Sequence, residues 1–201
     1  ESPSMLMARL GLPAKTVREL VDLARAKPGE LTFGTAGQGS TAHLASELFL
    51  GIAGVKMLHV PFKGVALSIA DVVAERIDIA IAGLASGMAQ VRSGRVRGLA
   101  VSGKERSSVL PDVPTFAEAG FPDYRMIHFW GVAAPAATPP RLVSRLNLEV
   151  ARALEKPRLK ELFLSQGARA VPSSPTELSR RISEEMKMWR DVIVRNAVKV
   201  E

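Results

Sequence analysis

Apolar residues along this chain alternate between helical spacing and short continuous runs. The stretches with helical spacing each predict a helix with one buried face, and they run from Thr16 to Lys27, from Leu44 to Gly54, from Val65 to Val73 and over residues 86–94. The apolar runs between them predict strands: LTFGTA at 31–36, KMLHVPF at 56–62, IDIAIAG at 77–83 and VRGLAVSG at 96–103. IDIAIAG is apolar at nearly every position, which is typical of a strand buried on both faces.

Local start and stop signals support several of these helices. Thr16 and Glu19 have the spacing of a capping box, and a second one follows at Ser174 and Glu177. Lys27-Pro28-Gly29 predicts the end of the first helix. Gly54 predicts the end of the second.

Helices that alternate with apolar strands predict right-handed crossovers and a parallel sheet, the α/β class. We therefore expect one doubly wound lobe up to about residue 103, followed by an irregular proline-rich connection. Residues 124–135 read as an extended segment, and the remaining chain predicts helices near 138–154, 157–167 and 174–193. This tail has few strands of its own, so its core needs strands from elsewhere.

Composition excludes several classes of protein. Lys and Arg number 27 against 20 Asp and Glu, a surplus of seven, which favours anionic partners. Aromatic residues make up only 5% and are not interleaved with basic ones, which disfavours nucleic-acid binding. There is no cysteine to form a disulfide, a thiolate metal site or a nucleophile. Neither a membrane-spanning apolar run nor a signal-peptide pattern is visible in the sequence.

The loop FGTAGQGSTAH, residues 33–43, is the strongest candidate binding element. It lies between a predicted strand and a predicted helix, where α/β proteins bind their ligands. Gly37 and Gly39 let the backbone approach a ligand, while Ser40, Thr41 and the free N–H groups of the helix offer donors to an oxyanion. Lys63 and Gly64 follow the next strand and lie at the same edge of the sheet, where the lysine adds a cation.

Two enzyme hypotheses compete with anion binding. The first hypothesis is a dinucleotide-binding enzyme. Against it, Gly34, Gly37 and Gly39 do not have the G-x-G-x-x-G spacing of dinucleotide-binding loops, and no acidic residue stands at the end of the next predicted strand. The second hypothesis is a hydrolase with Ser40 as nucleophile and His43 as general base. Against it, the sequence has no G-x-S-x-G nucleophile elbow and no obvious acidic residue to orient the histidine. Both hypotheses are weaker than simple anion binding.

Histidines and carboxylates do not form an obvious catalytic or metal site. His43, His59 and His128 lie in different elements, so we expect structural hydrogen bonds rather than metal ligation, with His43 donating to Glu47 one turn later. The acidic residues beside the third helix are interpreted as solvated: Asp71, Glu75 and Asp78. No cofactor and no metal site is expected.

Four stretches together resemble a known family. They are residues 16–49 with the G-x-G-S-x-x-H loop, VPFKG at 60–64, residues 93–124 with PDVPTFAEAG, and WGVAAPAATPPRLVSRLN at 130–147. In this order they resemble the solute-binding proteins of tripartite tricarboxylate transporters, the Bug or TctC family. The resemblance runs from about Leu12 to the C-terminus.

This resemblance implies a type II periplasmic-binding-protein fold, in which two α/β lobes close on a small carboxylate without catalysis. Residues 5–126 then form one complete lobe, and residues 127–201 form the C-terminal portion of the other. The resemblance also implies a periplasmic location, and as partners the membrane components of the transporter. The solute would be a di- or tricarboxylate, an acidic amino acid or an aromatic acid. The implied contacts come from two loops: Thr35, Ala36, Gly37, Gly39, Ser40, Thr41, Lys63 and Gly64.

The chain departs from the family pattern in two ways. The family's Asp-Asn pair after the third predicted strand is here Ala82 and Gly83, which favours a more apolar ligand or none. The family's first hundred or so residues, which hold the other side of the solute, have no counterpart, so we expect exposed apolar surface that is covered by a homodimer, by domain exchange or by an N-terminal segment missing from this sequence. The alternative function is a degenerate lobe that acts as an oligomerising or interaction module.

Overall fold

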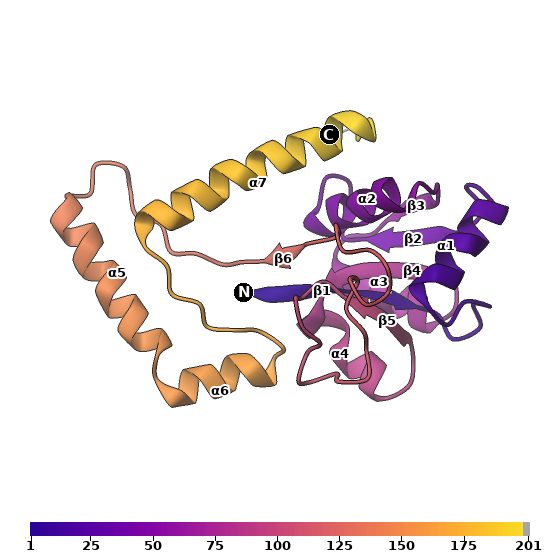
Figure 1. Ribbon diagram of the computed structural model, residues 1–201, viewed down its shortest axis with the longest axis horizontal. Coiled ribbons are helices and arrows are strands. Elements are labelled where there is room, and N and C mark those ends of the chain that lie inside the picture. The colour runs from indigo at the N-terminus through magenta and orange to yellow at the C-terminus, as the bar shows by residue number, and fades with distance from the viewer. Residues whose placement is uncertain (199–201) are drawn as a thin grey trace.

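The computed structural model describes residues 1–198 and has a mixed sheet flanked by helices, followed by a helical tail (Figure 1). All the predicted helices and strands are present. In the sheet-containing part the elements are β1 Ser2–Ala8, α1 Val17–Ala26, β2 Thr32–Thr35, α2 Thr41–Ala53, β3 Leu58–Pro61, α3 Val65–Val73, β4 Ile79–Gly83, α4 Leu84–Arg92, β5 Arg97–Val101 and β6 Ile127–His128. The tail contains α5 Pro140–Leu154, α6 Pro157–Ser165 and α7 Pro175–Arg195.

The strand order is β3-β2-β4-β1-β5, and the expectation of a wholly parallel sheet was wrong. β2 is parallel to both β3 and β4, as the crossover pattern predicts. β1 is antiparallel to β4 and to β5 and lies between them, and its first residues also pair with β6. The N-terminal strand, which the pattern analysis did not identify, therefore occupies a central position.

β1 is central because both of its faces are apolar. Leu6 and Ala8 point into one core, and Met5 and Met7 point into the other. In β4 the same division holds, with its isoleucines on one side and its alanines on the other. The second half of β1, Met5–Ala8, is wholly apolar and buried, which suits a position between two neighbouring strands.

The two cores lie on opposite faces of the sheet. Helices α1 and α2 pack on one face, where Phe49, Phe116 and Tyr124 form edge-on and tilted ring contacts. The Tyr124 hydroxyl donates to the Ala45 carbonyl at 3.2 Å, which joins the irregular connection to α2. Helices α3 and α4 cover the other face. This two-sided cover is the doubly wound arrangement that the alternating pattern predicts.

The helix signals read from the sequence are confirmed. Thr16 caps α1, and Gly54 ends α2 in the left-handed conformation at φ 63°. Ser174 and Glu177 form a complete capping box at α7. At α1 the Glu19 carboxylate accepts from the amide of Lys15 rather than from that of the capping residue.

The environment of one carboxylate, that of Asp78, differs from the prediction. Asp78, interpreted as solvated, is buried at the start of β4 and accepts hydrogen bonds from both the backbone and the hydroxyl of Thr32. Glu75 and Asp71 do lie nearer the surface, where they pair with Arg9 and Arg76 respectively.

The tail after β6 is loosely attached to the rest of the molecule. Helices α5 and α6 lie away from the sheet, and α7 returns across α2 (Figure 1). Among the described residues after Met126, only Val192 is buried. Many large apolar side chains are correspondingly exposed, among them Trp130, Val132, Leu142, Leu146, Leu162 and Met186.

Candidate functional site

Parallel strand direction gathers the candidate residues at one edge of the sheet. β2, β3 and β4 are parallel, so their carboxyl ends at Thr35, Pro61 and Gly83 share that edge. β1 begins at the same edge because it runs in the opposite direction, with Ser4 opposite Gly83. β6 joins there through the pairing of Ser2 with His128.

The loop after β2 is held by its own hydrogen bonds. The Thr35 hydroxyl is buried and accepts from the Gly37 amide at 3.2 Å. The Ser40 hydroxyl donates to the Gly37 carbonyl at 2.7 Å and caps α2 by accepting from the amide of His43. Gly37 and Gly39 have φ values of 122° and 67°, which favour glycine.

These bonds decide which loop groups are available to a ligand. The Gly37 and Gly39 amides both have acceptors within the protein, Thr35 Oγ1 and His43 Nδ1 respectively. In the part of the chain that the structure describes, the amides of Thr41 and Ala42 have no acceptor. They are the first two helical positions of α2, where free N–H groups attract an anion.

The loop after β3 lies beside the glycine loop. The Phe62 amide donates to the Thr35 carbonyl at 3.2 Å, and a Cβ on Gly37 would lie 3.3 Å from the Phe62 carbonyl oxygen. Lys63 is exposed, and no ion pair of its ammonium occurs within residues 1–198. Gly64 begins α3 with φ at 129°. The expected convergence of the two loops is therefore present.

Two histidines meet beneath the glycine loop. The rings of His43 on α2 and His59 on β3 stack with centroids 3.9 Å apart and an interplanar angle of 7°. Phe33 on β2 continues the stack, 5.0 Å from His59. The His59 Nε2 lies 2.7 Å from the Thr35 Oγ1, and the His43 Nε2 lies 3.6 Å from a Glu47 carboxylate oxygen. The predicted His43–Glu47 contact is thus present, but sequence spacing did not reveal the His43–His59 stack.

Burial keeps this histidine pair neutral. It lowers the pKa of His43, and burial together with the neighbouring His43 lowers the pKa of His59 to about 4. Burial also raises the pKa of Glu47. The lowered pKa values reflect a buried pair whose nitrogens face protein groups: His43 Nδ1 accepts from the Gly39 amide, His43 Nε2 faces Glu47, and His59 Nε2 bonds to Thr35.

The small residues Ala82 and Gly83 form the end of β4, which lies beside the third histidine, His128. His128 on β6 packs over Gly83, where a Cβ would lie 3.6 Å from the His128 Cδ2. The His128 Nε2 lies 2.9 Å from the Ser4 Oγ, so β6 is tied to β1 by side chains as well as by backbone. Burial lowers the pKa of His128.

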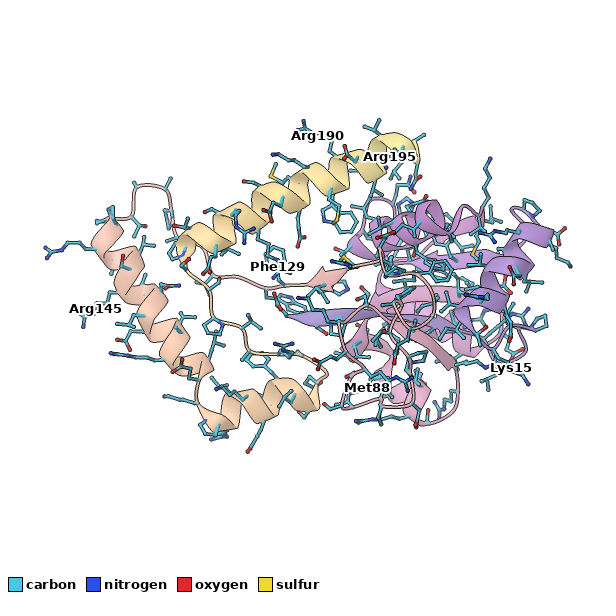
Figure 2. The ribbon with its side chains drawn as sticks, in the orientation of Figure 1. Lys15, Met88, Phe129, Arg145, Arg190 and Arg195 are labelled. Atoms are coloured by element: carbon cyan, nitrogen blue, oxygen red, sulfur yellow. The ribbon has the colours of Figure 1, made fainter. Side chains whose placement is uncertain are left out.

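A pocket of about 360 Å³ adjoins the start of α2. It lies between α2, β6 with the segment that follows it, and α7, and Figure 2 shows Phe129 on that segment below α7. Its walls include Thr41, His128, Phe129, Trp130, Glu185 and Trp189. Except for Thr41, sequence reasoning did not assign these residues to a site. The available signal was that one of the chain's two tryptophans, Trp130, lies in the predicted extended segment and the other, Trp189, lies on the final helix.

The described residues contain no group of three or more histidine and acidic side chains placed to hold a metal ion. Within residues 1–198, the search also found no helix with the length and hydropathy needed to cross a membrane.

Comparison with known proteins gives the same family from sequence and from structure. Residues 1–198 match the model of the tripartite tricarboxylate transporter family receptor, TctC. A UPF0065 protein from the tcbD-tcbE intergenic region of Pseudomonas sp. strain P51 is 36% identical over 193 residues, covering 96% of this chain and 57% of the relative. This chain therefore spans little more than half the length of that relative.

Two solved structures with bound acids share the fold. Rpa4515 of R. palustris, solved with adipate, has a TM-score of 0.87 at 33% identity, covering 98% of this chain and 66% of the other. MatC from Rhodopseudomonas palustris, with bound malate, has a TM-score of 0.83 at 29% identity, covering 96% and 66%. The matched family consists of periplasmic solute-binding receptors rather than enzymes, and its fold is the periplasmic-binding-protein fold expected from the sequence. The chain belongs to the TctC family of tripartite tricarboxylate transporter receptors.

Proposed function

We propose that this chain captures a small carboxylic acid at the start of α2, as the solute-binding component of a periplasmic tripartite transporter. The observation that carries the proposal is the pair of amides at Thr41 and Ala42, which have no acceptor among the described residues. Two N–H groups at a helix N-terminus suit the two oxygens of a carboxylate. The adipate and malate bound by two structural neighbours support the same class of ligand.

Each predicted contact residue has its own part in this proposal. Thr41 donates through its amide, and Lys63 adds positive charge from the adjoining loop. Gly37, Gly39 and Ser40 shape the loop, because their polar groups already bond within it. Ala36 and Gly64 let the two loops approach the ligand closely. Thr35 holds the loop from below.

The neighbouring pocket favours a solute with one carboxylate and an apolar, ring-shaped body. Phe129, Trp130 and Trp189 supply flat apolar surface, and Trp130 is 75% exposed. Among residues 1–198 no lysine or arginine lines the pocket itself, and the nearby Arg181 guanidinium lies over the Phe129 ring at 4.3 Å. The pocket's Glu185 carboxylate accepts from the Arg181 Nε at 3.2 Å and from the Trp189 Nε1 at 3.4 Å, so this wall presents an ion pair, not an available cation, to a second carboxylate on the solute. Ala82 and Gly83, in place of the family's polar pair, favour the same class.

The division of the chain belongs to this proposal as well. We assign residues 5–126 to the lobe that carries the carboxylate site and residues 127–201 to the C-terminal portion of the second lobe. The near absence of buried side chains in the described residues after Met126 supports the boundary.

The test is calorimetric titration with phenylacetate, benzoate, adipate and malate. We expect heat from the two aromatic acids and weaker or no binding of the two dicarboxylates. Both tryptophans of the chain line the pocket, so a change in tryptophan fluorescence should accompany binding. Binding of adipate or malate alone would refute the aromatic class but support carboxylate capture. Absence of binding by all four acids to the folded protein would contradict the capture of these solutes by this chain.

A matched pair of variants tests the amide itself. Thr41 is the first helical position of α2, where proline is well tolerated, and Ser40 before it is extended with ψ at 160°. Thr41→Pro removes the amide and the hydroxyl, whereas Thr41→Ala removes only the hydroxyl. Loss of a hydrogen bond to a charged group costs about 1.5–3 kcal/mol, or roughly 10- to 100-fold in affinity. We expect that loss for Thr41→Pro beyond whatever Thr41→Ala shows, and equal affinities would exclude the Thr41 amide from binding.

A further inference from the structure

The glycine loop is attached at both ends to the stacked histidine rings. His59 bonds to Thr35 at the start of the loop, and His43 accepts from the Gly39 amide near its end at 3.1 Å. The rings lie 3.9 Å apart and nearly parallel, so their stacking sets the spacing of the two attachment points. The ring stacking joins α2 to β3. The position of the two rings is therefore set by these two elements and not by the loop alone.

The hydrogen bond to Gly39 specifies the chemical form of His43. An imidazole nitrogen that accepts a hydrogen bond must carry its lone pair, so Nδ1 is unprotonated. The proton of the neutral ring then lies on Nε2, which faces the Glu47 carboxyl at 3.6 Å. His43 is 3% exposed, and no rearrangement of solvent can readily replace this acceptor.

We propose that His43 is a positioning residue of the carboxylate loop, which it holds in its binding conformation only as the neutral ring protonated on Nε2. The inference rests on the proposed function, because the loop in question is the one assigned to carboxylate capture. His43 orients the Gln38–Gly39 peptide, and Ser40 then follows as the cap that starts α2. The direction in which the free amides of Thr41 and Ala42 point depends on where Ser40 begins the helix.

Protonation of His43 would remove this support. The doubly protonated ring places an N–H at Nδ1, opposite the Gly39 N–H, and two donors cannot bond to each other. Within the described residues, the titratable groups that contact the ring are Glu47 on its own helix and His59 on β3, while β2 contributes the ring of Phe33. Burial lowers the pKa of His43, which keeps the ring neutral at neutral pH.

Asparagine and glutamine at residue 43 form a matched test. The Oδ1 of asparagine can occupy the place of Nδ1 and accept from Gly39, whereas the carbonyl of glutamine reaches the place of Nε2. Both variants lose the ring and its stacking on His59, so they differ mainly in the position of the acceptor. His43→Asn should therefore keep the loop conformation that His43→Gln loses.

The first measurement needs no ligand. Nuclear magnetic resonance of the wild-type chain should show the Nε2–H tautomer of His43 and a scalar coupling across the hydrogen bond from the Gly39 amide to Nδ1. The amide resonances of Gly39, Thr41 and Ala42 should move together in His43→Gln and stay near wild-type positions in His43→Asn. A tautomer protonated on Nδ1, or loop resonances that do not move in His43→Gln, would overturn the proposal.

The second measurement is the affinity for phenylacetate against pH. Wild-type affinity should be constant above about pH 6.5, the ordinary pKa of histidine, and fall at more acidic pH. His43→Asn should bind within about threefold of the wild type at neutral pH and lose most of this acid dependence, while His43→Gln should bind at least tenfold more weakly. Equal pH profiles for wild type and His43→Asn would overturn the proposal. If phenylacetate fails to bind but the resonance results hold, the proposed solute is wrong and the positioning role stands.

Discussion

Asp78 accepts two hydrogen bonds from Thr32, one from its amide at 2.8 Å and one from its hydroxyl at 2.9 Å. The other carboxylate oxygen accepts from the Arg9 Nε at 2.8 Å. Asp78 immediately precedes β4, Thr32 begins β2 and Arg9 follows β1, so one buried carboxylate joins three neighbouring strands at the end of the sheet opposite the site.

We predict that Asp78→Ala destabilises the protein by about 3 kcal/mol, because it removes the acceptor of the Arg9 Nε and of the Thr32 amide. Asp78→Asn should cost less, since its carbonyl can still accept from one of them. Urea denaturation measures both. Asp71→Ala is the control, because its pair with Arg76 lies at the surface and is worth little. Equal costs for Asp78→Ala and Asp71→Ala would show that the buried network contributes no special stability.

Ser68 provides a second prediction, because its hydroxyl is buried and has no hydrogen-bond partner among residues 1–198. Ser68→Ala should stabilise the protein by about 1 kcal/mol, since it removes an unsatisfied polar group. Gly34→Ala should destabilise it, because the added Cβ would lie 2.7 Å from the Ser68 Oγ. The double variant should be more stable than the sum of the single changes predicts. Strict additivity in thermal unfolding would contradict the contact.

The pH dependence of stability follows from His59. Its pKa is about 4 in the folded protein against 6.5 ordinarily, so between these values the unfolded chain binds the extra proton. The free energy of unfolding should therefore fall as pH drops from about 6.5 toward 4. His59→Phe, which keeps a ring beside His43, should reduce this slope. Equal slopes for the two proteins in denaturant titrations at several pH values would exclude His59 as the cause.

The exposed apolar face of the tail predicts self-association. Leu142 and Leu146 lie one turn apart on α5 and are 47% and 49% exposed. Such a stripe favours contact with another apolar surface, and a second copy of the chain supplies one. We predict concentration-dependent association in analytical ultracentrifugation, reduced by the double change Leu142→Glu and Leu146→Glu. A single monomeric species at all concentrations would contradict both the homodimer and the interaction module.

Apart from β1, the residue pattern predicted the helices and strands of the lobe, because helix and strand periodicity are local properties. The helix signals at Thr16, Gly54 and Ser174 are also local, and each lies where the structure has a helix end. The glycine loop was recognisable for the same reason, since its glycines, hydroxyls and following helix are contiguous in the chain.

The parts that sequence reasoning missed depend on residues far apart in the chain. β1 pairs with β4 and β5, more than 70 residues later, and a short apolar run does not reveal its direction. His43 and His59 belong to different elements and meet only because α2 packs beside β3. The aromatic pocket likewise combines β6 and the segment after it with a helix near the C-terminus.

Sequence reasoning alone identified the helices and strands that follow β1, the loop that offers amides to an anion, and the family. These depend on periodicity, capping and contiguous motifs, which act within a few residues. Only the tertiary structure decided which amides remain free, which acceptor holds Gly39, and that Asp78 is buried. The physical reason is that burial and hydrogen-bond partners are set by packing between distant segments, where a buried polar group must find its partner.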